Sequence, residues 1–200
     1  MGSEIIDGNL FLYLEYVPGG SLGDLIRNFG PLSEKLIKIY IRQILKGLQY
    51  LHSKGIVHRD IKAANVLLDT CGTVKLSDFG CSGQISLSSS HSENELLNSI
   101  KGSIPWMAPE VICQSKYGCK ADIWSLGCLI IELKTGKSPW GKLDNFIQAL
   151  FKIGRSQALP EFPVDISDNL KDFLCMCINR SQDLRPDVAL LLNHPFLFPN

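Results

Sequence analysis

The stretch from Ala121 to Thr135 most constrains how this chain folds, because it is apolar on nearly every side of a helix. An ordinary surface helix has one apolar stripe, so a helix that is apolar all round has to be buried in a core. Gly136 follows directly and is placed to end the helix. With 200 residues and 45% hydrophobic content, the chain is long enough to surround that helix. We therefore expect one globular unit around a buried helix over 121–135.

Four further helices are predicted from capping residues and apolar periodicity. Ser33 is placed to cap a long helix, and Gly55 to end it. Between them, apolar residues recur every three or four positions, which is typical of a helix with one buried face. The apolar face of this long helix consists of Ile37, Tyr40, Ile41, Ile44, Leu48 and Leu51. The other three helices are expected over Ser21–Phe29 (closed by Gly30), Ser167–Ile178 and Pro186–Asn193, which begins with a proline.

Strand signals are fewer. Leu10–Val17 has strand composition and ends at a Pro-Gly-Gly turn. Val66–Asp69 and Thr73–Ser77 flank Cys71-Gly72 and predict a hairpin with a two-residue loop. That loop pairs Asp69 with Val74 and sets Asn65 opposite Asp78. An amide oxygen and a carboxylate side by side suit a hard cation such as Mg²⁺.

Composition excludes several classes of function. The 20 basic and 20 acidic residues balance, so no charge excess favours nucleic acid or anionic lipid. The seven cysteines are dispersed without a CxxC pair, which is typical of reduced thiols inside a cell. The longest apolar run, around 126–133, is far shorter than the roughly 18–20 residues of a membrane span. The polar start, 1–8, is unlike a secretory signal. We expect a cytoplasmic chain, also present in the nucleus, with no nucleic-acid partner and no membrane span.

Four motifs in order carry the chemistry. They are His58-Arg-Asp-Ile-Lys-Ala-Ala-Asn65, Asp78-Phe-Gly80, Ala108-Pro-Glu110 and Asp122-Ile-Trp-Ser-Leu-Gly127, with Arg185 behind them. In this order and spacing, the motifs resemble those of a eukaryotic Ser/Thr protein kinase domain. The stretch 99–110, Trp140, 149–154 and His194-Pro-Phe196 further resembles the mitogen-activated protein kinase kinase kinases of the MEKK type.

The resemblance implies a protein-kinase-like α+β fold, reduced mainly to its helical C-lobe. Residues 1–17 would be a remnant of the N-lobe with the hinge, and residues 18–200 the C-lobe with a short β-hairpin. Within the C-lobe, the catalytic loop would be residues 58–65 and the activation segment residues 78–110.

Catalytic roles follow from the same resemblance. Asp60 would orient or accept the proton of the substrate hydroxyl, and Lys62 would neutralise the transferring phosphoryl group. Asn65 and Asp78 would hold Mg²⁺. Ser103 stands where relatives usually carry threonine, and its hydroxyl would bridge Asp60 and Lys62.

The resemblance also assigns ATP-binding positions. Leu14 would be the gatekeeper, and the backbone of Glu15 to Val17 the adenine-binding hinge. Leu67 would form the apolar floor under the base. Ser21 matches a ribose-side position that is often acidic in relatives.

Structural and regulatory positions complete the set. Glu110 and Arg185 would form a buried ion pair, and Asp122 would brace the catalytic-loop backbone. Arg59, which precedes the catalytic aspartate, would pair with a phosphate on Ser99 and so order the activation segment. His52 reads as a surface residue.

The implied function is ATP- and Mg²⁺-dependent phosphorylation of a protein serine or threonine, with a MAP kinase kinase as substrate and an upstream kinase or regulator as activator. A complete kinase domain also has a Gly-rich loop and a strand lysine before the hinge. This sequence has no GxGxxG, and its first lysine, Lys35, falls in the long helix. We therefore expect the chain alone to be inactive or nearly so. The alternatives are a pseudokinase, or a truncated scaffold that acts by protein binding.

Overall fold

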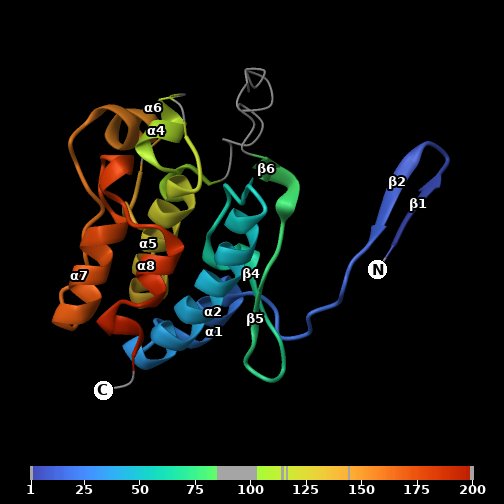
Figure 1. The fold of residues 1–200 in the computed structure, drawn as a ribbon, viewed down its shortest axis with the longest axis horizontal. Helices are drawn as coiled ribbons and strands as arrows, with labels where there is room; N and C mark the ends of the chain where they lie inside the picture. The colour runs from blue at the N-terminus through green and yellow to red at the C-terminus, as the bar shows by residue number, and fades with distance from the viewer. Residues whose placement is uncertain (1, 85–102, 114, 116, 144, 199–200) are drawn as a thin grey trace.

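The structure, a computed structural model, describes residues 2–84, 103–113, 115, 117–143 and 145–198. Its main part is a body of packed helices (Figure 1), with a two-stranded hairpin along one side. A second hairpin, at the N-terminal end, stands apart from this body on an extended connection (Figure 1). The protein-kinase-like α+β fold expected from the motifs agrees with this mainly helical arrangement.

Helix α5 (Lys120–Thr135) lies at the centre of the body, as its composition predicts. Twelve of its residues are buried, and Gly136 ends it in a left-handed conformation with φ 67°. Its neighbours approach closely at Gly127, where a Cβ atom would lie 2.7 Å from Ile178 Cδ1. Only glycine fits that contact without displacement. Helices α1 (Leu22–Phe29), α2 (Glu34–Ser53) and α7 (Asp168–Cys177) pack on α5. The other helices of the body are α4 (Pro109–Ile112), α6 (Phe146–Leu150) and α8 (Val188–Leu192).

The predicted cap of α2 is confirmed, because the Ser33 side chain accepts a backbone N–H from the first turn. Ser21 and Ser167, the first residues of two predicted helices, lie just before α1 and α7 and cap them in the same way. The predicted start of the last helix is wrong by two residues. Pro186 lies before the helix, and the side chain of Asp187 caps α8 by accepting the backbone N–H of Leu190 at 2.8 Å.

The hairpin of β4 (Val66–Leu68) and β5 (Val74–Leu76) is confirmed, but its predicted register is wrong by one residue. Leu68, not Asp69, pairs with Val74. Asp69 Oδ1 accepts the backbone N–H groups of Cys71 and Thr73, both at 2.8 Å. This carboxylate closes a three-residue loop with Gly72 at φ 81°, so every pairing moves by one position.

The N-terminal hairpin joins β1 (Gly2–Ile6) to β2 (Asn9–Tyr13) through Asp7 and Gly8, both at positive φ. This is the two-residue turn that Asp-Gly favours. Sequence reasoning missed β1, and the strand predicted over Leu10–Val17 ends at Tyr13. All ten strand residues are exposed.

Short elements complete the chain. Strands β3 (Ile56–Val57) and β6 (Gly83–Gln84) pair beside the catalytic loop. No described helix combines the length and apolar content that a membrane crossing demands. The 3₁₀ turns are Ala63–Asn65, Phe79–Cys81, Ile104–Trp106, Gln182–Leu184 and Pro195–Leu197, and Phe151–Arg155 forms a π-helical turn.

Candidate active site

The predicted catalytic residues gather around one carboxylate. Asp60 is 7% exposed, and its Oδ2 accepts Lys62 Nζ at 2.8 Å and Asn65 Nδ2 at 2.7 Å. Asn65 Nδ2 also donates to the backbone carbonyl of Asp60 at 2.9 Å. Asp60 Oδ1 is buried and accepts no hydrogen bond from the described part of the chain. A buried anionic oxygen without a donor is costly. The site therefore holds an acceptor ready for a hydroxyl that enters from outside.

Ser103 joins this cluster from the other end of the activation segment. Lys62 Nζ donates to Ser103 Oγ at 2.6 Å while it pairs with Asp60. The hydroxyl and the carboxylate are thus bridged by the ammonium group, which lies between them. One lysine therefore ties the catalytic loop to the segment that ends at Glu110.

Asp122 braces the catalytic loop, as predicted. Its fully buried carboxylate accepts the backbone N–H of His58 at 3.0 Å and that of Arg59 at 2.9 Å. Arg59 has φ 70°, a left-handed conformation that costs free energy for a residue with a side chain. The two charge-assisted hydrogen bonds stabilise this turn, which places Asp60 behind it.

His52 is a partner of Asp122 that sequence reasoning missed. It was predicted at the surface, but its side chain is 13% exposed and its Nε2 lies 2.8 Å from Asp122 Oδ2. Burial lowers the pKa of His52, but hydrogen bonds to Asp122 and Cys119 outweigh it and raise the pKa to about 9. His52 is therefore protonated at neutral pH and balances the buried charge of Asp122. The position of His52 on α2 did not predict its contact with Asp122.

His58 links the catalytic loop to the strand before Asp78. Its ring lies 3.1 Å from the Ser77 carbonyl through Nε2, while Nδ1 accepts the Asp60 N–H at 3.3 Å. One donor and one acceptor are what the neutral ring offers. Burial, the largest effect, lowers the pKa of His58 and favours this neutral form. The ring also packs against Phe79, with centroids 5.1 Å apart.

The predicted metal ligands, Asn65 and Asp78, both lie at the open end of the hairpin, but they are not opposite each other. Asn65 is opposite Ser77, whose backbone N–H donates to the Asn65 carbonyl at 3.0 Å. Asp78 comes next, exposed and at φ 60°, with Oδ1 accepting only the Gly80 N–H, at 3.3 Å, among described contacts.

These two residues fit a magnesium ion. The amide nitrogen of Asn65 is held by Asp60, which leaves the amide oxygen as a free acceptor, and Asp78 offers a second oxygen. Mg²⁺ prefers oxygen ligands and commonly takes one or two from protein, with water and phosphate supplying the others. No group of three or more acidic, His or Cys side chains in the described ranges offers a closed metal cage. The donor set thus suits a metal that arrives with a phosphate ligand.

Glu110 and Arg185 form the predicted buried ion pair. Arg185 Nη1 and Nη2 donate to the two Glu110 oxygens at 2.6 and 2.8 Å, and Arg185 and Glu110 are 1% and 8% exposed, respectively. The guanidinium also lies 5.1 Å from the ring centroid of Trp124. This pair fixes the end of the activation segment against the core.

Glu132 is a second residue that sequence reasoning missed. Its Oε2 accepts the backbone N–H of Ala63 at 3.0 Å and the indole N–H of Trp106 at 2.8 Å. Burial, the largest effect, raises the pKa of Glu132. One carboxylate of α5 therefore connects the catalytic loop with the turn that follows Ser103.

The predicted ATP-binding residues lie on or near the extended connection between β2 and α1. Leu14 is 79% exposed, and Glu15 forms an ion pair with Lys75 of β5. Ser21 and Leu67 form an isolated β-bridge, which places these two predicted positions side by side. The Ser21 hydroxyl already donates to Asp24 Oδ2 at 2.7 Å within the cap of α1.

The role of these residues in ATP binding therefore stays a prediction, as does that of Val17, which is half-buried. The predicted phosphate site Ser99 lies outside the described residues.

Comparison with known sequences identifies the class. The family model described as "Protein kinase domain" matches residues 3–197, so the chain belongs to the protein kinase family. Members of this family generally use ATP and Mg²⁺.

Its relatives define the subgroup. The chain is 45% identical to mitogen-activated protein kinase kinase kinase A of Dictyostelium discoideum, over 98% of this chain and 20% of that protein. It is 46% identical to mitogen-activated protein kinase kinase kinase 3 of Arabidopsis thaliana, over 98% of this chain and 31% of the relative. YODA, another such kinase of Arabidopsis thaliana, is 47% identical over 98% of this chain and 22% of its own length. The predicted resemblance is confirmed, and the chain spans a fifth to a third of these relatives.

Proposed function

We propose that the protein containing this chain is an ATP-dependent serine/threonine kinase of a mitogen-activated cascade. The observation that carries the proposal is the Asp60 carboxylate, with one oxygen held by Lys62 and Asn65 and the other buried without a donor. A general base has to present a free oxygen within hydrogen-bond reach of the proton that it accepts.

In this mechanism Asp60 Oδ1 accepts the proton of a serine or threonine hydroxyl as the hydroxyl oxygen bonds to the γ-phosphorus. The bond to the β,γ-bridging oxygen breaks, and ADP carries that electron pair away. Lys62, held between Asp60 and Ser103, is placed to neutralise charge on the transferred phosphoryl oxygens. Asn65 and Asp78 would hold Mg²⁺, which supplies charge neutralisation on the ATP phosphates when bound.

The substrate class is proposed from the names of the relatives, which are kinases of MAP kinase kinases. The intact protein is expected to phosphorylate a recombinant MAP kinase kinase on serine or threonine in the presence of MgATP. Mass spectrometry of the product identifies the modified residues, and EDTA should abolish the transfer. Two results would refute the proposal. One is phosphate on tyrosine alone, and the other is a lack of phosphate transfer by both the intact protein and its Asp60→Asn variant.

We also propose that the 200-residue chain transfers little phosphate by itself. The first lysine of the sequence, Lys35, lies on α2, so this chain offers no strand lysine to bind the ATP phosphates. In addition, Leu14, the predicted gatekeeper of the ATP site, is 79% exposed. Phosphotransfer by the isolated chain at a rate close to that of the intact protein would contradict this proposal. The same assay separates the enzyme from the pseudokinase scaffold, for which both proteins would be inactive.

Regulation is proposed to act through Arg59. Its guanidinium carbon lies 5.2 Å from the ring centroid of Tyr117, beyond the activation segment. A phosphate on Ser99 would add a strong acceptor for this guanidinium. Ser99→Ala in the intact protein should lower activity, and Ser99→Asp should restore part of it; unchanged activity of Ser99→Ala would exclude this site.

A further inference from the structure

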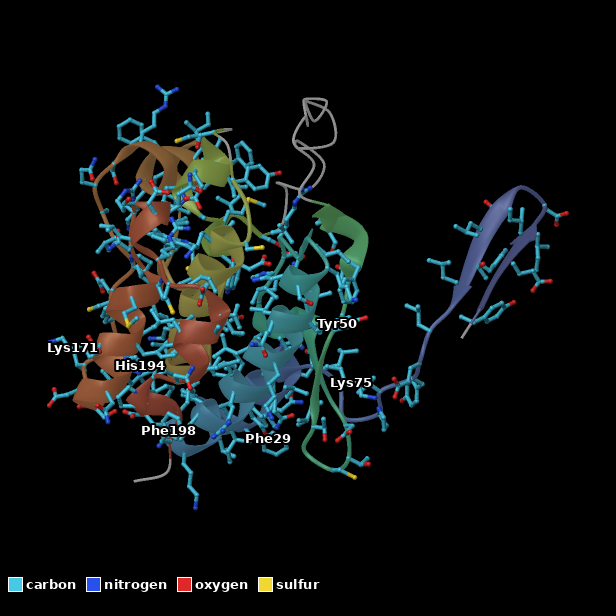
Figure 2. All side chains as sticks on the ribbon, in the orientation of Figure 1. Phe29, Tyr50, Lys75, Lys171, His194 and Phe198 are labelled. Atoms are coloured by element: carbon cyan, nitrogen blue, oxygen red, sulfur yellow. The ribbon has the colours of Figure 1, made fainter. Side chains whose placement is uncertain are left out.

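A hollow of about 580 Å³ lies at the opposite end of α2 from the catalytic loop. Its walls come from three parts of the chain: the first turns of α2, the start of α7 and the C-terminal 3₁₀ turn. Its volume falls within the range of pockets that bind ligands. Figure 2 shows Phe198, which follows that turn, at the lower edge of the helical body, on the same side as the C terminus in Figure 1. The residues that matter below are Lys35, Lys38, Ile39, Arg42, Phe196 and Leu197.

The rim of this hollow is positively charged. Lys35, Lys38 and Arg42 follow one another at helical spacing on one face of α2 and cover about 10 Å of its length. Glu34 is the one acidic residue of this helix, and both of its oxygens accept hydrogen bonds from Ser167, at 2.8 and 2.7 Å. Glu34 lines the hollow and keeps its own negative charge, so three cations against one carboxylate leave the rim with a net positive charge.

The acidic residues of α7 do not balance this charge either. Asp172 lies 3.0 Å from His194 Nε2, and neither it nor Asp168 lines the hollow.

Two of the cations are held in place with donors to spare. Lys38 Nζ donates to the Phe198 carbonyl at 2.8 Å and lies 5.9 Å from the Phe196 ring centroid. Arg42 Nη1 donates to the Leu197 carbonyl at 3.4 Å. An ammonium has three donors and a guanidinium five, so both groups can bind an additional anionic acceptor.

The floor of the hollow is apolar. Phe196 and Leu197 are each 2% exposed and form a packed base, while Ile39 is 44% exposed at its edge. A free inorganic anion would use the cations but leave the exposed part of Ile39 in water. A peptide that combines carboxylates with a bulky apolar side chain would use both.

We propose that this hollow is a docking site for an acidic segment of a partner protein, one that places carboxylates along the α2 rim and a bulky apolar side chain against Ile39. Charge complementarity selects this occupant over a basic or neutral segment. The site is remote from the catalytic cluster and does not depend on the proposed activity.

The test uses the intact protein and a fluorescein-labelled peptide of twelve residues that repeats glutamate, glutamate, leucine and phenylalanine. Fluorescence anisotropy should show saturable binding that weakens as salt rises from 50 to 300 mM, because added ions screen exposed charges. Matched peptides replace glutamate with lysine, or replace both apolar residues with alanine. Each should bind at least fivefold more weakly than the acidic apolar peptide.

Two variants of α2 make the test specific. Lys35→Glu reverses an exposed cation on the rim and should weaken binding at least fivefold. Lys46→Glu is the matched control, since Lys46 is also exposed on α2 but lies outside the hollow, and it should leave binding within twofold. Circular dichroism confirms that both variants fold.

Three results would overturn the proposal: no binding of the acidic peptide at 1 mM, equal binding of the lysine peptide, or equal loss in the two variants. Displacement of the peptide by self-association, seen as a dimer in light scattering, would assign the hollow to a second copy of the chain and also overturn it.

Discussion

Removing one partner of the Glu110–Arg185 pair should be among the most destabilising single changes in this chain. The two groups form two parallel hydrogen bonds of 2.6 and 2.8 Å in a site where Arg185 is 1% exposed. Breaking such a pair strands a buried charge, which costs about 3–5 kcal/mol. Total stabilities of domains are only about 5–15 kcal/mol, so this loss would be large.

The two single variants should differ. After Glu110→Gln, the guanidinium still has carbonyl acceptors on Asn179 and Lys120, at 2.6 and 2.9 Å, so the loss should be near 3 kcal/mol. After Arg185→Met, the Glu110 carboxylate loses both of its described hydrogen bonds, so the loss should approach roughly 5 kcal/mol. The double variant should be more stable than additivity predicts, with a coupling of about 2–3 kcal/mol.

Urea unfolding of the intact protein, followed by circular dichroism, measures these differences. Arg27→Met is the matched control, because Arg27 pairs with Asp24 on the surface with side chains 72% and 46% exposed. Such a pair contributes about 0–1 kcal/mol. If Glu110→Gln and Arg185→Met each cost no more than this control, or if their costs simply add, the argument from burial is refuted.

Three other predictions concern pH, packing and catalysis. The raised pKa of His52 means that its ion pair stabilises the fold fully below pH 6.5 and loses this contribution as pH rises through about 9. Urea unfolding should therefore show a stability gap between wild type and His52→Gln, of at most roughly 3 kcal/mol, that narrows over this range; a constant gap would contradict the assignment. Gly127→Ala should cost about 1–3 kcal/mol, seen as a lower melting temperature, because its Cβ would meet an isoleucine Cδ1 at 2.7 Å. Gly118→Ala, with nothing within 4 Å, should be nearly neutral, and equal losses at both glycines would exclude the packing argument. Ser103→Ala should lower kcat about tenfold with little change in the KM for ATP, since it removes a hydrogen bond to Lys62, whereas Ser103→Thr should keep activity; a change in KM alone would speak against this role.

The helical core was predictable because the signals for it are local. Apolar content around all sides of 121–135 required a buried helix, and the Ser33 cap indicated the start of α2. The catalytic cluster was predictable because its motifs resemble those of protein kinases. Asp60, Lys62 and Asn65 share one short loop, whereas Ser103 comes from a distant segment and contacts Lys62 only in the folded chain.

The hairpin register was not predictable from loop length alone. The choice between a two- and a three-residue loop depended on the Asp69 carboxylate, which accepts two backbone N–H groups inside the turn. A single-residue shift then changes every pairing, and it set Asn65 opposite Ser77 in place of Asp78.

Residues that act across the fold were missed for a related reason. His52 lies near the end of an amphipathic helix, and only the packing of α2 on α5 brings it to Asp122. Glu132 likewise occurs near the polar end of α5, and its contacts to Ala63 and Trp106 join segments far apart in the sequence. No periodicity in the sequence encodes such contacts.

The central claim is that Asp60 Oδ1 receives the proton of a substrate hydroxyl, and the most direct test is the kcat of Asp60→Asn in the intact protein at saturating MgATP. The substitution keeps the size of the side chain but removes its charge and basicity. The account predicts a fall in kcat of about 10²–10⁴, with little change in the KM for ATP. A variant that retains at least a tenth of the wild-type kcat would contradict it.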